Sequence, residues 1–162
     1  MKKILWLHGA IGSAAQMRPL SGALSSSFQT AAISFSGHGG RAMPEEFSIQ
    51  TFANNVLEWM TENDLETIDI FGYSMGGYAA LYLARHFPEK VGRIMTFGTK
   101  LNWTPDSAER ETRMLNPEKI EQKVPQFAKA LEAAHAPQDW KNVLTSTASM
   151  LVEMGANPPL SN

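Results

Sequence analysis

Four short apolar segments alternate with stretches of helical periodicity through the first hundred residues, and this alternation constrains the fold more than any other feature. The segments are residues 3–7, 30–35, 67–71 and 93–97. Each is almost continuously apolar, which is typical of strands covered on both faces of a parallel sheet. Parallel strands need long crossover connections, which the helical stretches supply. We therefore predict an α/β fold with a parallel sheet of about four strands and flanking helices.

The stretches between the apolar segments carry recognisable helix signals. Ser13 fits the start of a capping box, and Pro19 is expected to separate the first turn of this helix from the rest. Ser48 is predicted to cap an amphipathic helix whose apolar positions, within residues 49–60, share one face. A third helix is expected after Gly77 and up to Phe87, because Pro88 follows.

No strand signal follows residue 100, and the rest of the chain is predicted to be helical. Helices are expected to begin at Pro117, Pro125 and Pro137. The last of them should stop at Gly155, and residues 157–162 have the composition of a linker. We therefore divide the chain into an α/β core, residues 1–100, and a helical segment, residues 101–162.

Composition excludes several classes of function. The 14 Lys and Arg against 16 Asp and Glu leave a formal net charge of −2, which argues against general binding to nucleic acids or anionic membranes. The chain contains no cysteine, so disulfides, thiolate catalysis and cysteine zinc sites are excluded. No apolar run approaches the roughly 18 residues of a membrane span. No targeting signal is evident, so the expected location is cytoplasmic.

The third apolar segment runs into Gly-Tyr-Ser-Met-Gly, residues 72–76, and a helix is predicted to follow. This context makes the short G-x-S-x-G pattern informative, because a strand–turn–helix bend exposes the serine at the carboxyl end of the sheet. The first amides of the helix point to the same place. We therefore predict Ser74 as a nucleophile toward acyl carbon and the Met75 amide as an oxyanion donor. The alternative is a tight turn whose serine only caps the helix.

The first apolar segment is followed by His8, Gly9 and Ala10. In a parallel sheet this loop lies beside the end of the third strand, at the edge where such folds bind ligands. The backbone amide of Ala10 is therefore a candidate for the second oxyanion donor. His8, Gly9 and Tyr73 are candidates for the wall of the substrate pocket. We expect the His8 ring to shape the loop by hydrogen bonding rather than to act as a base.

Two glycine-rich patterns imitate nucleotide-binding signatures but lack essential parts. No helix opens directly after the first pattern, residues 37–42, because Pro44 follows. The second, residues 72–77, is followed by Tyr and Ala where a phosphate loop requires Lys and Ser or Thr. We therefore predict no nucleotide cofactor.

The other three histidines receive structural interpretations. His38 is expected to be exposed and to shape its loop, and His86 to interact with the carboxyl end of its helix. His135 is expected to lie between helices of the second half. No pair of histidines has metal-ligand spacing, so we expect no metal.

The chain resembles the α/β-hydrolase superfamily over nearly its whole length. The resemblance rests on His-Gly-Ala at residues 8–10, Ser-Gly-His-Gly at residues 36–39 and Gly-Tyr-Ser-Met-Gly-Gly at residues 72–77, in this order. It implies the strand order 2-1-3-4 and a serine nucleophile at position 74 with the two amides already named. It also implies that the helices after the fourth strand form a lid. The motifs are specific for the superfamily but not for a substrate.

The sequence departs from the family pattern after the fourth strand. Members carry an acid and a general-base histidine after later strands, and no position of this chain matches that histidine. Some members carry the acid where Gly98, Thr99 and Lys100 stand here. The resemblance therefore covers the amino-terminal part of a hydrolase, either truncated or naturally short. A serine without a base keeps a high pKa, so we predict that this chain alone is weak or inactive.

The fourth strand is predicted to be an exposed edge. Later strands of the family would pair with residues 93–97, which are left open here. An apolar edge strand tends to pair with another chain. We therefore expect a homo-oligomer, formed through this edge or by exchange of the helical segment.

The functional hypothesis is a serine hydrolase that acts on a carboxylic ester or a similar acyl bond of a small molecule. Serine at position 74 disfavours the haloalkane dehalogenases of the superfamily, which use Asp there. The alternative is a non-catalytic module that binds a ligand or partner through the open site. Turnover that depends on Ser74 would distinguish the two.

Overall fold

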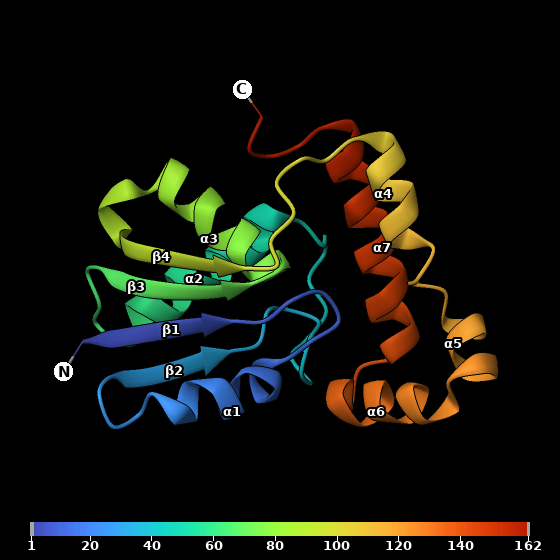
Figure 1. Cartoon of the computed structure of the whole chain (residues 1–162), viewed down its shortest axis with the longest axis horizontal. Helices are drawn as coiled ribbons and strands as arrows, with labels where there is room; N and C mark the ends of the chain where they lie inside the picture. Colours follow the sequence, from blue (N-terminus) through green and yellow to red (C-terminus); the bar gives the residue numbers. More distant parts are fainter. Residues whose placement is uncertain (1, 162) are drawn as a thin grey trace.

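A four-stranded sheet organises the first part of the molecule (Figure 1). The computed structural model describes residues 2–161. All strands are parallel and lie in the order β2-β1-β3-β4. They are β1 (Lys3–Leu7), β2 (Gln29–Ile33), β3 (Ile68–Tyr73) and β4 (Val91–Phe97). The predicted α/β fold with a parallel sheet in this order is confirmed.

Three helices flank the sheet, as predicted. The helix α1 (Ala14–Ala23) lies along β1 and β2 on one face, whereas α2 (Ile49–Glu62) and α3 (Met75–His86) pack together on the other (Figure 1). A short 3-10 helix, η1 (Pro88–Lys90), joins α3 to β4. The main core lies between the sheet and the pair α2 and α3, where alternate strand residues meet the apolar helix faces.

The start of the chain's first helix differs from the prediction. The helix α1 continues through Pro19, because the position is exposed and the carbonyl left without a partner can reach water. Ser13 is the N-cap, but its hydroxyl caps nothing. The Ser34 hydroxyl, at the end of β2, accepts the Ala14 N–H at 2.9 Å instead. At α2 the prediction is confirmed, since the Ser48 hydroxyl accepts from the Thr51 N–H at 3.0 Å.

Four more helices stand across the carboxyl ends of the strands (Figure 1). They are α4 (Pro105–Thr112), α5 (Pro117–Lys123), α6 (Pro125–His135) and α7 (Trp140–Ala156). The starts predicted at Pro117 and Pro125 are confirmed, but α7 begins at Trp140 rather than Pro137, because the Asp139 carboxylate caps it through the Lys141 N–H.

The helical part differs from the prediction in three further ways. The helix α4 was not predicted, although Thr104 and Ser107 form a capping box at its start. Gly155 lies inside α7 rather than after it, because it is where the helices cross: a Cβ there would meet the Ala108 Cβ at 2.6 Å. The linker-like tail also docks, since the Leu160 N–H donates to the Tyr78 hydroxyl at 3.1 Å.

Candidate active site

Ser74 stands alone between the last residue of β3 and the first residue of α3. Its backbone has φ 50° and ψ −115°, a conformation that non-glycine residues rarely adopt. Hydrogen bonds of the Ser74 backbone hold the bend. The Ser74 N–H donates to the Phe97 carbonyl at 2.8 Å, and the Ser74 carbonyl accepts from the Gly77 N–H at 3.0 Å and from the Thr99 hydroxyl at 2.9 Å. This sharp, strained bend is the geometry that the sequence pattern predicted.

Glycines allow the strand and the helix to approach closely at this bend. A Cβ on Gly76 would lie 2.7 Å from the His8 carbonyl oxygen, so the start of α3 sits directly against the end of β1. A Cβ on Gly72 would overlap the backbone of Gly77. Larger residues at either position would push α3 off the sheet and move Ser74.

The loop after β1 lies against Ser74. A Cβ on Gly9 would be 3.2 Å from the Ser74 Cβ. Ala10, Ser74 and Met75 together line one cavity of about 150 Å³. Met75 is the first residue of α3, so its amide has no partner within the helix and is free to bind an anion. The structure thus brings the three predicted catalytic positions to one cavity, and their roles remain predictions.

The predicted pocket residues lie behind this cavity rather than in its wall. His8 and Gly9 are buried beneath the loop. Tyr73 packs its ring against Phe97, with the centroids 6.1 Å apart. The remaining wall comes from α3, the segment after β4 and the helical part, through Tyr78, Gly98, Lys100, Trp103, Glu111, Leu151 and Met154.

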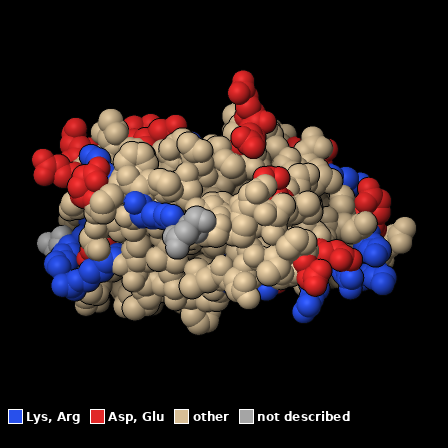
Figure 2. Space-filling view, turned by 90° about the horizontal axis from the view of Figure 1, so that it is seen from above, with Lys and Arg blue, Asp and Glu red and all other residues tan. Residues whose placement is uncertain are grey.

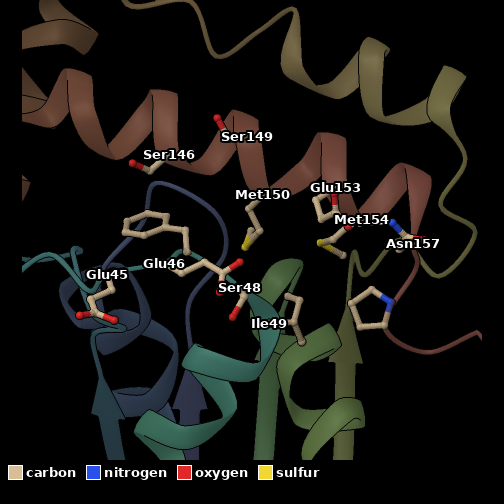
Figure 3. A pocket seen from close by; sticks show the side chains of 12 residues that line it. Glu45, Glu46, Ser48, Ile49, Ser146, Ser149, Met150, Glu153, Met154 and Asn157 are labelled. Carbon is tan, nitrogen blue, oxygen red and sulfur yellow. Dashed lines mark hydrogen bonds between the residues drawn. The ribbon is translucent and has the colours of Figure 1, made fainter.

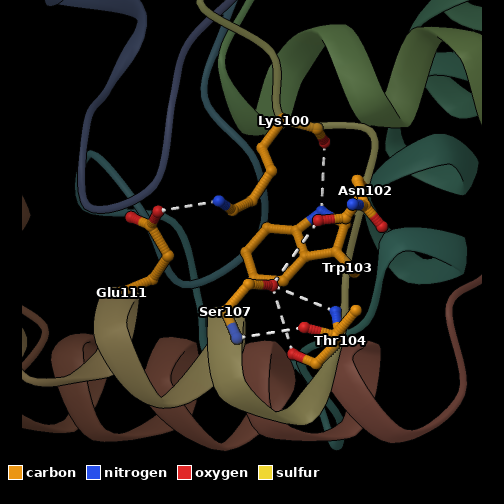
Figure 4. A network of polar contacts seen from close by, with 6 residues as sticks. All are labelled: Lys100, Asn102, Trp103, Thr104, Ser107 and Glu111. Carbon is orange, nitrogen blue, oxygen red and sulfur yellow. Dashed lines mark hydrogen bonds and ion pairs between the residues drawn. The ribbon is translucent and has the colours of Figure 1, made fainter.

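A polar network borders the cavity on the side of α4 (Figure 4). The Lys100 ammonium lies 3.3 Å from the Glu111 carboxylate and 5.8 Å from the centre of the Trp103 ring. The Trp103 indole N–H donates to the Lys100 carbonyl at 3.1 Å. Because Lys100 and Glu111 are both about 40% exposed, their ion pair contributes little to stability. Both side chains line the cavity beside Ser74.

The His8 ring is fixed by two backbone groups. Its Nε2 accepts from the Phe35 N–H at 3.0 Å, so the proton is on Nδ1, which donates to the Gly9 carbonyl at 2.7 Å. Burial, with His38 nearby, lowers the pKa of His8 to about 3. The ring is therefore neutral at pH 7 and holds the loop, in the role expected for it.

His38 is fully buried, so the prediction that it is exposed was wrong. Gly37 and Gly39 have φ of 75° and 57°, and this double bend turns the ring inward beside Phe47 and Phe52. Its Nδ1 lies 3.1 Å from the Ser36 carbonyl oxygen, and its Nε2 has no hydrogen-bond partner among the described residues. Burial lowers the pKa of His38 to about 4.

His135 ends α6 and reaches into the α/β part instead of lying between helices. It is buried, and its ring centre is 5.7 Å from that of His38, which is 5.0 Å from that of His8. The sequence offered no signal for this trio, because His135 is 97 residues beyond His38. The fourth histidine, His86, packs its ring against Tyr82 at the end of α3, with the centroids 4.2 Å apart.

No histidine ring of the described chain, residues 2–161, is hydrogen-bonded to the Ser74 hydroxyl. The same residues hold no cluster of three or more His, Asp or Glu side chains suited to a metal ion. Between residues 2 and 161 there is also no helix with the length and apolar character needed to cross a membrane.

Similar proteins place this chain in a family. The family described as alpha/beta hydrolase fold matches residues 3–158. A pimeloyl-[acyl-carrier protein] methyl ester esterase of Neisseria meningitidis is 32% identical over 92 residues, which are 56% of this chain and 34% of that protein. A probable alcohol acetyltransferase of Wickerhamomyces anomalus is 31% identical over 90 residues, 54% of this chain and 26% of that protein. The chain thus spans about a third or less of these relatives.

Solved structures share the fold at low sequence identity. A thermophilic esterase from Thermogutta terrifontis matches with a TM-score of 0.72 and 15% identity, over 98% of this chain and 65% of that chain. The enol-lactonase from Burkholderia xenovorans matches with a TM-score of 0.70 and 16% identity, over 93% of this chain and 65% of that chain. These structures share the fold, and the family match over residues 3–158 shows that the chain belongs to the alpha/beta hydrolase fold family.

Proposed function

We propose that this chain carries the nucleophile and oxyanion-binding part of a serine hydrolase that cleaves carboxylic esters. The observation that carries the proposal is the strained backbone of Ser74 at a strand–helix junction, with Ala10 and Met75 around the same cavity. Preorganised amides at such a position stabilise the charge that develops on the carbonyl oxygen. The names of the relatives, an ester esterase and an acetyltransferase among them, agree with acyl chemistry.

The proposed reaction has two halves. The Ser74 oxygen bonds to the acyl carbon, the bond to the alcohol oxygen breaks, and the serine proton ends on the released alcohol. Water then adds to the acyl carbon, the bond to Ser74 breaks, and the serine regains a proton as the acid leaves. The amides of Ala10 and Met75 would bind the oxyanion in both halves.

The spaces around Ser74 suggest how an ester would bind. The cavity of about 150 Å³ suits a short acyl group. A larger groove of about 460 Å³ lies between α7 and the segment that leads into α2 (Figure 3). Met154 lines both spaces, so the distal part of a substrate would pass this side chain. Glu45, Glu46 and Glu153 line the groove, which favours a neutral or cationic distal group over a carboxylate.

We expect the chain by itself to acylate slowly. Each histidine ring bonds or stacks elsewhere, so the Ser74 proton has no imidazole to receive it. We therefore propose that the general base for Ser74 is not among residues 2–161. The cytoplasmic location expected from the sequence belongs to the same proposal.

Labelling with a fluorophosphonate tests the proposal. We expect slow labelling of one serine per chain, identified by peptide mass spectrometry as Ser74 and abolished in Ser74→Ala. Ser26→Ala is the matched control, since Ser26 is exposed and far from the cavity. Labelling elsewhere would contradict the proposal, and so would a folded protein with no labelling at all. The second outcome would favour the alternative, a non-catalytic module that binds a ligand through the open site.

A further inference from the structure

The loop that carries the Ala10 amide is strained and depends on other parts of the molecule for its shape. The Gly12 N–H donates to the Gly9 carbonyl at 3.1 Å, which closes a turn with Ala10 and Ile11 at its centre. Ile11 has φ 55°, an unfavourable value for a β-branched residue. Such strain persists only where surrounding contacts hold it.

His135 supplies one of these contacts from the helical part. Its Nε2 lies 3.0 Å from the Ile11 carbonyl oxygen, and its Nδ1 lies 3.1 Å from the Gly39 amide nitrogen. A backbone amide can only donate and a carbonyl can only accept, so the proton must be on Nε2. The neutral ring thus bonds to the loops after β1 and β2 at the same time. Burial, which lowers the pKa of His135, favours this neutral form.

Side-chain packing strengthens the same connection. Ile11 packs against the apolar cluster of the helical part, which contains Ile120, Ala128, Leu131, Trp140 and Leu144. A Cβ on Gly40 would lie 2.7 Å from the Ala136 carbonyl oxygen, so the loop after β2 touches the end of α6. Both the carbonyl and the side chain of Ile11 are therefore held by the helices beyond residue 115.

We propose that His135 is a positioning residue for the oxyanion site: its bond to the Ile11 carbonyl holds the turn that aims the Ala10 amide toward Ser74. The inference rests on the proposed hydrolase function. It makes the oxyanion donor depend on the docking of α6, which lies more than fifty residues beyond Ser74 in the sequence. If α6 moved away, Ile11 would lose its partner and the turn could relax from its strained φ.

Two substitutions separate the two bonds of His135. In His135→Gln the amide nitrogen reaches the place of Nε2 and can still donate to Ile11. In His135→Asn the amide oxygen takes the place of Nδ1, so it can accept from Gly39 but cannot reach Ile11. The exposed His86→Gln, at the end of α3, is the control. Thermal unfolding monitored by circular dichroism establishes that each variant is folded.

The first measurement is the concentration dependence of Ser74 labelling by a fluorophosphonate. We expect the maximal rate to fall about tenfold in His135→Asn, since a mispositioned oxyanion donor costs less than the 10²–10³ of a deleted one. The concentration for half-maximal rate should change little. His135→Gln should stay within about threefold of the unmodified chain, because it keeps the donor to Ile11. Equal rates in the two variants would overturn the proposal.

The second measurement does not depend on reactivity. Amide chemical shifts of Ala10 and Gly12, measured by ¹H–¹⁵N NMR, should move in His135→Asn and stay close to their original values in His135→Gln. If Ala10 and Gly12 do not respond in His135→Asn, the positioning role is wrong even where Ser74 reacts. If they respond but Ser74 is unreactive in the unmodified chain, the positioning of the turn stands and the hydrolase function fails.

Discussion

The sheet part and the helical part of this molecule are held together in different ways. In the first, strands and helices that follow one another in sequence pack into one core. In the second, α7 is the only helix between residues 2 and 161 whose buried side chains join that core, through Val143, Met150, Leu151 and Met154, while Leu115 packs against it from the loop before α5. The helices α5 and α6 pack instead on a small separate cluster with one face of α7. The expected lid is therefore not uniform: α7 is part of the core, whereas α5 and α6 attach through the smaller cluster and His135.

This difference matters for the candidate active site, because its parts come from both regions. Ser74 and Met75 stand on the rigid junction of β3 and α3, at the centre of the sheet. The Ala10 loop stands between the regions, bonded to His8 below and His135 above. The nucleophile should therefore tolerate disturbance of the helical part, and the Ala10 donor should not.

The largest expected effect is a loss of stability at acidic pH. It is caused by the histidine trio, His8, His38 and His135, at the junction of the regions. His8 and His38 have pKa values of about 3 and about 4 in the folded chain, below the ordinary value of 6.5, and the pKa of His135 is also lowered. The unfolded chain therefore takes up protons first as the pH falls below 6.5. The free energy of unfolding should fall by about 4 kcal/mol between pH 7 and pH 5. It should fall further toward pH 3, where the folded rings protonate too.

Urea unfolding at pH 7, 6 and 5 measures this effect. The window lies above the ordinary pKa of carboxylic acids, so Asp and Glu contribute little to it. The control is His86→Gln, which removes an exposed histidine outside the trio. A free energy of unfolding that is constant from pH 7 to pH 5 would show that the trio is not neutral in the folded state.

Two adjacent residues of α7 test the separation of the two apolar clusters. Val143 is fully buried in the main core and Leu144 is fully buried in the small cluster. Leu144→Ala should cost about 3 kcal/mol by creating a cavity, and Val143→Ala about 2 kcal/mol. We expect hydrogen exchange in Leu144→Ala to rise mainly in α5 and α6, and in Val143→Ala to rise through the sheet as well.

Hydrogen exchange by mass spectrometry resolves these segments. The same pattern in both variants would mean that the chain opens as one unit, and the contrast between α7 and its neighbours would then be absent. Opening of β1 to β4 in Leu144→Ala alone would reverse the contrast.

The smallest effect on stability is expected at the free edge of the sheet. Met95 and Phe97 in β4 are each 65% exposed. Seen from above, the molecule carries clusters of charge at its two ends and a mostly uncharged surface with a few basic and acidic groups between them (Figure 2). The sequence predicted self-association through this edge. Met95→Lys should lower the fraction of dimer while changing the free energy of unfolding of the monomer by less than about 0.5 kcal/mol. Light scattering over a range of concentrations measures the dimer, and a monomer at all concentrations would contradict the prediction.

Much of the sheet part could be predicted because its signals are local. An apolar run followed by glycine and then a helix specifies the bend at Ser74, since neighbouring residues impose the strain themselves. Crossover handedness and the family resemblance together supplied the strand order. One error in this part occurred where a distant side chain replaced the local cap of a helix. The Ser34 hydroxyl, for example, caps α1 in place of Ser13.

The sequence alone therefore specified the α/β fold, the bend at Ser74 and its closeness to the loop of Ala10, because periodicity and turn chemistry act over a few residues. Only the tertiary structure decided that His38 is buried and that His135 reaches the Ile11 carbonyl. It also decided that α7 completes the main core. These contacts join residues up to 124 positions apart, and no pattern along the chain encodes which loop a distant side chain will meet.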